Sequence, residues 1–317
     1  MKRFALLVIT GLVFALNVSS PVYGWGSATH AYIVHRTVGK GSADMQAIYG
    51  SVLADVFNTM VADPYRDPLW VLTHYDFQKF VDQAQSPNDK ALAYGFASHN
   101  ESWGADKTAH ISSVGLAQSG YVIHKSQELA AVLMPSVRLF LLANGVSNPD
   151  EVLDLALPTV AHTAIETAVD LLLCRNEDPD LGQRLVLAAQ TRGWAAPILL
   201  CKAYAGDVAA TAGVPESVAS ALIVGAENEF RLQMQVYGAA FCKEDPVQAL
   251  AEQGVELSKQ ILASAQGGVI DVPVDLMKQI LTTAVDVVKG DYAAEVEATL
   301  TQVRKELELH AFAEPGL

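Results

Sequence analysis

Imidazole and carboxylate side chains gather on apolar, helix-forming segments before residue 170. His162 and Glu166 are four residues apart, so one face of a helix would carry both side chains. His99, Asp106 and His110 are separated by seven and four residues, which places all three on one stripe of a helix. Burying such groups among apolar neighbours is costly unless they are paired or bound to a metal. The pattern therefore predicts a metal site between the helices of a bundle.

Three further candidate ligands come earlier in the chain, namely His30, Asp55 and His74. Asp63 competes with Asp55 for the same role. Imidazole nitrogen and carboxylate oxygen are both zinc ligands. Each residue also has an ordinary interpretation, such as a helix cap for Asp55 or a simple ion pair for the others, and only the combination indicates metal binding. We interpret the remaining histidines as surface or core side chains without a ligand role: His35, His124 and His310.

Helix start signals recur along the chain. Ser86-Pro87-Asn88-Asp89 and Asn148-Pro149-Asp150-Glu151 each combine a capping side chain, a proline in the first turn and an early acid. This combination is typical of a helix N-terminus. Two further starts are indicated at Asp245-Pro246 and Val272-Pro273.

The helices that follow these starts carry the candidate ligands. We expect one helix from Ala91 to about His110, and another from Val152 to Cys174 with a kink at Pro158. Alternating strand patterns with hairpin turns are scarce. The predicted fold class is therefore all-α, a multi-helix bundle with the metal cleft between its helices.

Composition limits the partners of the protein. The 317 residues are 51% apolar and include 21 basic and 35 acidic side chains, for a formal charge of −14. An acidic chain repels a phosphate backbone, so no stable nucleic-acid binding is expected. Bound metal ions would reverse the field locally, and phosphate-containing substrates stay compatible with the charge. The sequence makes no prediction of the oligomeric state.

Residues 1–24 have the pattern of a signal peptide. Lys2 and Arg3 precede the apolar run from Phe4 to Leu16, and Val22-Tyr23-Gly24 offers a cleavage site. The alternative is an uncleaved N-terminal anchor. Cleavage after Gly24 would release a secreted or periplasmic chain that begins at Trp25.

The histidines divide the mature chain into two regions. Seven of the eight lie within residues 25–204, which we interpret as the chemical region, whereas residues 205–317 contain only His310. The second region is expected to be helical, either as a separate unit or as part of the same domain. In an oxidising compartment one pair of cysteines could form a disulfide, and the three are Cys174, Cys201 and Cys242.

Residues 25–175 resemble the zinc-dependent phospholipase C family and, more distantly, single-strand-specific nucleases. The opening segment Trp25-Gly26-Ser27-Ala28-Thr29-His30 matches the start of the mature family chain, whose tryptophan binds zinc through its α-amine and carbonyl. The family motif also places an aspartate four residues after a histidine, where this chain has Trp103 after His99. Asp106 is the nearest acid, and an inserted turn would bring it into the family position.

The resemblance implies a tri-zinc cleft with about three zinc ions and a secreted phosphodiesterase. Nine residues would hold the zinc: Trp25, His30, Asp55, His74, His99, Asp106, His110, His162 and Glu166. Asp55 would be both a ligand and a candidate catalytic general base, or a ligand only. The implied reaction is phospholipase C-type hydrolysis of a phospholipid by a metal-activated water, with peripheral membrane contact.

Two other functions are consistent with the same residues. One is a zinc-dependent nuclease or nucleotidase of the related branch. That branch prefers aspartate at the last ligand position, so Glu166 favours the phospholipase branch. The other is a secreted zinc-binding protein without catalytic activity.

Overall fold

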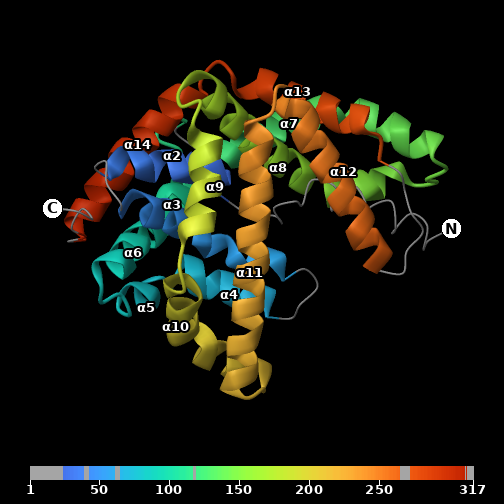
Figure 1. The fold of residues 1–317 in the computed structure, drawn as a ribbon. Coiled ribbons are helices and arrows are strands. Elements are labelled where there is room, and N and C mark those ends of the chain that lie inside the picture. Colours follow the sequence, from blue (N-terminus) through green and yellow to red (C-terminus); the bar gives the residue numbers. More distant parts are fainter. Residues whose placement is uncertain are drawn as a thin grey trace.

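The structure is a computed structural model that describes residues 24–38, 43–60, 65–116, 119–264, 272–310 and 312. These residues form helices and no strand, which confirms the predicted all-α fold (Figure 1). Two short elements are not α-helical, since η1 is a 3₁₀-helix and η2 a π-helix. The elements are α2 (Ser27–Thr37), α3 (Ala43–Leu53), η1 (Ala54–Thr59), α4 (Arg66–His74), α5 (Gln78–Val81), α6 (Pro87–His99), η2 (Lys107–Ile111), α7 (Tyr121–Ala143), α8 (Pro149–Asn176), α9 (Leu181–Thr191), α10 (Ala195–Ala212), α11 (Glu216–Phe241), α12 (Pro246–Ser264), α13 (Val274–Val288) and α14 (Tyr292–Leu309).

The predicted helix starts are confirmed. Ser86 and Asp89 form a capping box at α6, in which each side chain accepts the other residue's backbone N–H at 3.1 Å. α8 begins at Pro149 and α12 at Pro246, while Pro273 precedes α13. α8 continues through Pro158.

The predicted single helix from Ala91 to His110 is wrong. α6 ends at His99, and the side chain of Asn100 then accepts backbone N–H groups of the following turn, at 2.8 Å from Ser102 and 2.9 Å from Trp103. An asparagine side chain competes with the helical carbonyls in this way and ends the helix. A second helical segment containing η2 begins after the turn, and Asp106 directly precedes η2.

The close packing of α3 against α6 brings candidate ligands together. A side chain on Gly50 or Gly95 would collide with the backbone of the facing helix, so only glycine permits this approach. α3 leads directly into η1, which contains Asp55, and α6 ends at His99. The two ligands therefore start from helices that are locked side by side.

The region after residue 204 is hydrogen-bonded to the region before it. α10 continues across this position, and Glu227 on α11 accepts the hydroxyl of Tyr49 on α3 at 2.8 Å. Glu295 on α14 accepts the backbone N–H groups of Val114 and Gly115, each at 2.7 Å, in the segment that follows η2. Helices from the C-terminal region thus hold segments next to the candidate ligands, as Figure 1 shows for α14 beside α2.

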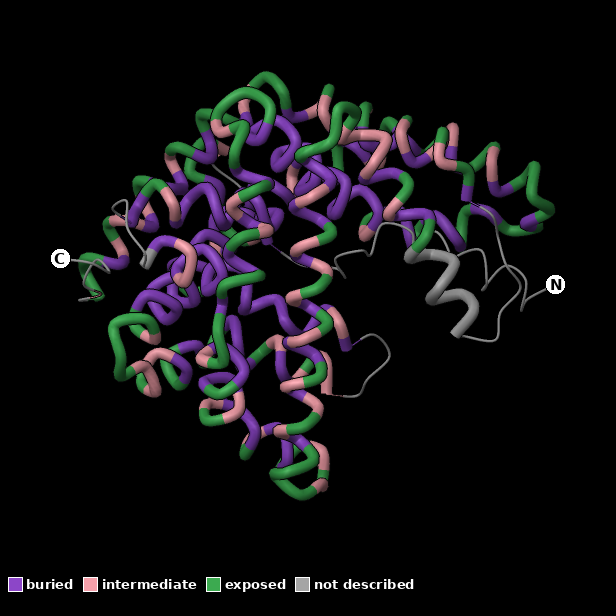
Figure 2. The backbone as a smooth tube through the Cα atoms, viewed as in Figure 1, coloured by how far each residue is buried: buried purple, intermediate pink, exposed green. Residues whose placement is uncertain are grey.

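Two helices are long and apolar enough to cross a membrane by length and composition: Tyr121–Ala143, and Ala156–Asn176 within α8. The apolar window in α8 is 89% buried inside the protein, whereas that of α7 is only 28% buried. Figure 2 shows buried backbone in the centre of the molecule and exposed backbone along its edges. α8 is therefore a core helix, and α7 presents apolar side chains on the surface.

Candidate metal centre

Asp106 lies between three histidines from three different helices. Its Oδ1 atom is 3.0 Å from His30 Nε2, and its Oδ2 atom is 2.9 Å from His99 Nε2 and 3.4 Å from His74 Nε2. All four side chains are fully buried. The two oxygens of one carboxylate thus face different imidazoles, which is the arrangement of a carboxylate shared between two ions.

Asp55 completes this cluster from η1. Its Oδ1 atom lies 3.6 Å from His74 Nε2 and 3.7 Å from His99 Nε2. Ligand atoms on a tetrahedral zinc ion are about 3.3 Å apart when each is about 2.0–2.1 Å from the metal, so these spacings fit a shared ion. We call the cluster the Asp106 group, and its members are His30, Asp55, His74, His99 and Asp106.

Five donor atoms of the Asp106 group have no hydrogen-bond partner outside the group in the described part of the chain. This holds for the Nε2 atoms of its three histidines and for Asp55 Oδ1 and Asp106 Oδ2, all of them buried. The other ring nitrogens are engaged in two of the histidines, because His99 Nδ1 lies 2.7 Å from the Ser51 carbonyl oxygen and His74 Nδ1 2.9 Å from the Thr73 hydroxyl. Such outer contacts orient an imidazole and leave Nε2 for a metal, so the donor set fits zinc.

A second cluster forms where α8 meets η2. His162 Nε2 lies 2.9 Å from Glu166 Oε1, and the His162 ring stacks on His110 with centroids 5.5 Å apart. Glu101 joins from the turn after α6, with Oε1 2.6 Å from His110 Nδ1. We call this cluster the Glu166 group, and its members are Glu101, His110, His162 and Glu166.

Glu101 is the site residue that the sequence analysis missed. Its side chain is only 3% exposed, and its Oε2 atom is buried without a hydrogen-bond partner among the described residues. Glu101, Asp106 and His110 can offer ligand atoms within 4.8 Å of one another. A carboxylate two residues after His99 matches no helical spacing, and it reaches the site only because the chain turns at Asn100.

The segment before α2 lies against both groups. The backbone nitrogen of Trp25 is 3.4 Å from Asp106 Oδ1, and the Gly24 N–H donates to Glu166 Oε1 at 3.2 Å. The Trp25 side chain is fully buried, and its indole N–H donates to the Thr108 hydroxyl at 2.9 Å. The backbone nitrogen of Trp25 thus lies beside Asp106, one of the candidate ligands.

Burial sets the charge state of the imidazoles. Burial lowers the pKa of His30, and it lowers the pKa of His110 to about 4. Burial acts in the same direction on His99, but the charges of Asp106 and Asp55 outweigh it and raise the pKa of His99 to about 9. In the absence of metal, an imidazolium therefore provides the positive charge beside Asp106.

The carboxyl groups of the Glu166 group have no comparable compensation. Burial, followed by the charge of Asp106, raises the pKa of Glu101 to about 8. Burial also raises the pKa of Glu166 well above its usual range. Both groups would ionise readily only beside a cation, which is the role that a metal ion would fill.

Other residues considered in the sequence lie elsewhere. Trp103 packs against Phe77 and stacks on His310, with centroids 5.5 and 4.9 Å apart, and is therefore not in the ligand position. His35 pairs with Asp44 and the exposed His124 with Glu128, away from both groups. Asp63 and residues 1–23 lie outside the described residues. The three cysteines are free.

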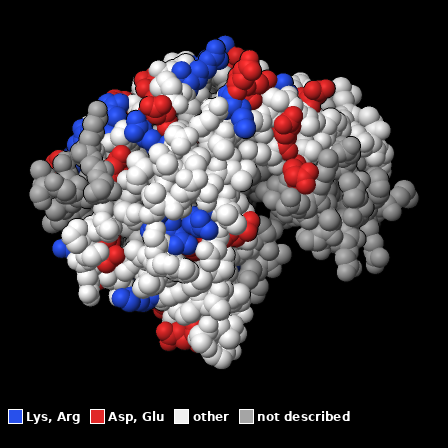
Figure 3. All heavy atoms as spheres, viewed as in Figure 1, with Lys and Arg blue, Asp and Glu red and all other residues white. Residues whose placement is uncertain are grey.

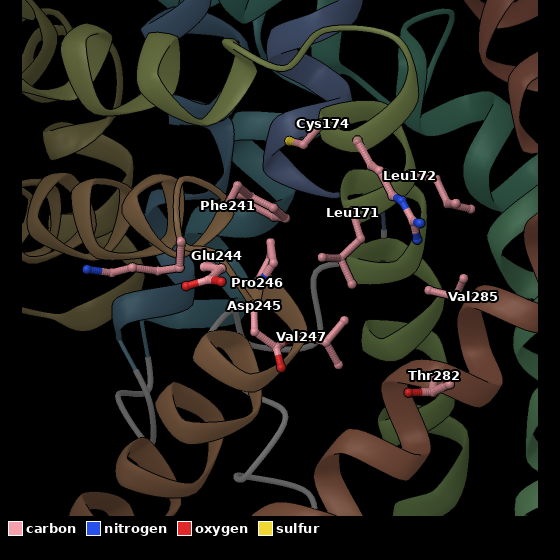
Figure 4. Close-up of a pocket in the computed structure, with 12 residues that line it drawn as sticks. Leu171, Leu172, Cys174, Phe241, Glu244, Asp245, Pro246, Val247, Thr282 and Val285 are labelled. Carbon is pink, nitrogen blue, oxygen red and sulfur yellow. The ribbon is translucent and has the colours of Figure 1, made fainter.

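A cavity of about 790 Å³ lies between α8, α13 and the turn from α11 to α12 (Figure 4). Leu171, Leu172 and Arg175 line it from α8. None of the residues that line the cavity belongs to the Asp106 group or to the Glu166 group. The cavity is therefore separate from the candidate metal centre.

Comparison of the chain with protein-family models, with curated proteins and with solved structures finds no match. The assignment of the site accordingly depends on its residues and their geometry.

Proposed function

We propose that the protein is a secreted zinc-dependent phosphodiesterase that hydrolyses phospholipids in the manner of a phospholipase C. The observation that carries this proposal is the convergence of nine buried or nearly buried imidazole and carboxylate side chains in two adjoining groups around Asp106. The sequence resemblance adds the reaction class. The proposed zinc ligands are the imidazole nitrogens and carboxylate oxygens of these two groups, together with the α-amine of Trp25.

The distances suggest how about three zinc ions would be shared out. The Trp25 amine, His30 and Asp106 Oδ1 would hold the first ion, and Asp55, His74, His99 and Asp106 Oδ2 the second. His110, His162 and Glu166, with Glu101 beside them, would hold the third. When bound, zinc supplies Lewis-acid polarisation of a phosphodiester and makes water a better nucleophile at neutral pH.

Asp55 would have two tasks in this arrangement. Its Oδ1 atom faces His74 and His99 at 3.6 and 3.7 Å, which supports a ligand role. The second carboxylate oxygen would accept the proton of the attacking water, as a general base must be within hydrogen-bond distance of that proton. Asp55→Asn keeps an oxygen ligand and removes the base, so it separates the two roles.

Removal of residues 1–24 would create the first zinc site. In the unprocessed chain the nitrogen of Trp25 is an amide, which does not bind zinc as an amine does, and the Gly24 N–H occupies Glu166 Oε1. A free α-amine has a pKa near 8, so zinc could displace its proton at neutral pH. Secretion would therefore be coupled to completion of the site.

A lipid substrate is favoured over nucleic acid by the surface. Val132, Leu139 and Leu142 on α7 are 59%, 69% and 50% exposed, and they offer an apolar face for peripheral contact with a membrane. On the face drawn in Figure 3, the basic side chains of the described residues form small separate groups among acidic ones. A continuous basic groove for a polynucleotide is not seen on that face.

The test uses processed, zinc-loaded protein with choline phospholipid vesicles and with single-stranded DNA as alternative substrates. We expect turnover on the phospholipid, and its loss in His162→Ala because the ligand on α8 is removed. His124→Ala is the matched control, since His124 is exposed and paired with Glu128 outside the site. DNA hydrolysis without lipid hydrolysis would move the proposal to the nuclease branch, and turnover of neither would reject it.

A further inference from the structure

One face of α8 carries a third buried side chain in line with His162 and Glu166. Asp170 follows Glu166 by four residues, so the three side chains lie one above another on the helix. Asp170 is fully buried, yet it belongs to neither the Asp106 group nor the Glu166 group. Its carboxylate instead faces the start of α2, which connects Trp25 to His30.

Four hydrogen bonds fix Asp170 to this segment and to α11. The Ala28 N–H donates to Oδ2 at 2.9 Å, and the N–H and hydroxyl of Thr29 donate to Oδ1 at 2.7 and 2.6 Å. The Tyr237 hydroxyl donates to Oδ2 at 2.9 Å. The first N–H groups of a helix have no partner within it, and Gly26 at the N-cap has no side chain to accept them. Asp170 provides that acceptor from another helix.

The segment before α2 is pressed against α8. A Cβ atom on Gly26 would lie 2.5 Å from Asp170 Oδ2, so a larger residue could not approach as closely. One turn earlier on α8, Glu166 accepts the N–H of Gly24. Residues 24–29 therefore run along the face of α8 that carries His162, Glu166 and Asp170.

We propose that Asp170 is a positioning residue that holds residues 25–29 on α8, so that the Trp25 nitrogen and His30 both reach Asp106. The inference rests on the proposed metal binding, because its effect concerns one ion. Trp25 and His30 are the two ligands of the N-terminal segment. Asp55, His74 and His99 come from other elements and do not depend on this contact.

Asp170→Asn in the processed chain, which begins at Trp25, tests the role. An amide nitrogen would replace one acceptor oxygen and would face a backbone or hydroxyl donor. We expect one zinc ion to bind roughly 10- to 100-fold more weakly, while the remaining zinc keeps its affinity. Elemental analysis after dialysis against graded chelator measures this, and hydrogen exchange of the backbone N–H groups in residues 26–29 should become faster.

Glu227→Gln is the matched control. Glu227 is also a fully buried carboxylate that accepts a tyrosine hydroxyl, but its partners are Tyr49 and Arg192 rather than the segment before α2. Tyr237→Phe and Tyr49→Phe form a milder pair if Asp170→Asn does not fold, since each removes one hydroxyl donor to a buried carboxylate. Tyr237→Phe should weaken the same zinc ion, and Tyr49→Phe should lower only the Tm.

Zinc affinities equal to those of the unaltered chain in both Asp170→Asn and Tyr237→Phe would overturn the proposal. So would a uniform loss of all zinc that Glu227→Gln reproduces. If the unaltered chain binds zinc but hydrolyses neither substrate, the proposed function fails, whereas the role of Asp170 is still decided by the zinc affinities of the variants.

Discussion

The Asp106 group and the Glu166 group use the same kinds of donor atom but are assembled differently. The Asp106 group draws its five residues from separate segments, and its side chains are at most 3% exposed. The Glu166 group takes two of its four residues from one turn of α8, and its His110 side chain is 9% exposed. The first group depends on tertiary packing throughout, whereas half of the second is preformed by a single helix.

The two groups also differ in charge. Three imidazoles face two carboxylates in the Asp106 group, and His99 with a pKa of about 9 can stand in for a cation. The Glu166 group has two carboxyl groups whose pKa values burial raises, Glu101 to about 8. The difference suggests that the Asp106 group stays ordered without metal more readily than the Glu166 group.

The largest expected effect comes from removing the residue that links two ions. Asp106→Asn should weaken zinc binding in the Asp106 group by more than the roughly 10- to 100-fold that an outer contact costs, and should abolish turnover. Elemental analysis and the vesicle assay measure both. Loss of a single zinc ion with turnover retained would show that Asp106 is not shared.

An extra residue before Trp25 should affect the Asp106 group most, because it removes the Trp25 amine, while its own nitrogen would lie at Glu166 Oε1. A chain that begins one residue earlier has an amide in place of the α-amine of Trp25, so one zinc ion and most of the activity should be lost. His162→Ala should instead remove the ion of the Glu166 group. If the extended chain carries full zinc and shows full turnover, the role assigned to the N-terminus is wrong.

The sequence named all five members of the Asp106 group but only three of the four members of the Glu166 group. His162 and Glu166 follow from a spacing of four, and the capping box of Ser86 and Asp89 follows from local residue types. The turn at Asn100 was missed because helical periodicity gives no sign of a side chain that accepts backbone N–H groups and so ends a helix. Glu101 was missed with it.

Contacts between residues far apart in the chain could not be predicted from the sequence either. Asp170 bonds to residues more than 140 positions away, and no local pattern distinguishes it from an ordinary helix acid. The resemblance stated only that Asp106 would need an inserted turn, because Trp103 stands where a carboxylate was expected, and the predicted helix ran on through this position. Trp103, the one departure from the family motif, thus marks the segment between His99 and Asp106 as the part of the site that the sequence alone could not place.

A smaller effect should appear in the pH dependence of zinc binding. At pH 7 and without metal, His99 with a pKa of about 9 and Glu101 with a pKa of about 8 each hold a proton that a bound ion would displace. Zinc affinity should therefore rise with pH up to about pH 9, by roughly tenfold per pH unit for each proton released. Chelator competition at several pH values measures the slope, and an affinity independent of pH would contradict the assigned ligands.

The zinc content of the correctly processed chain tests the central claim most directly. Protein that begins at Trp25 should retain about three zinc ions per chain after gel filtration in metal-free buffer, as measured by elemental analysis. A content well below one ion per chain after incubation with excess zinc would contradict the account, because neither the Asp106 group nor the Glu166 group would then be a metal site.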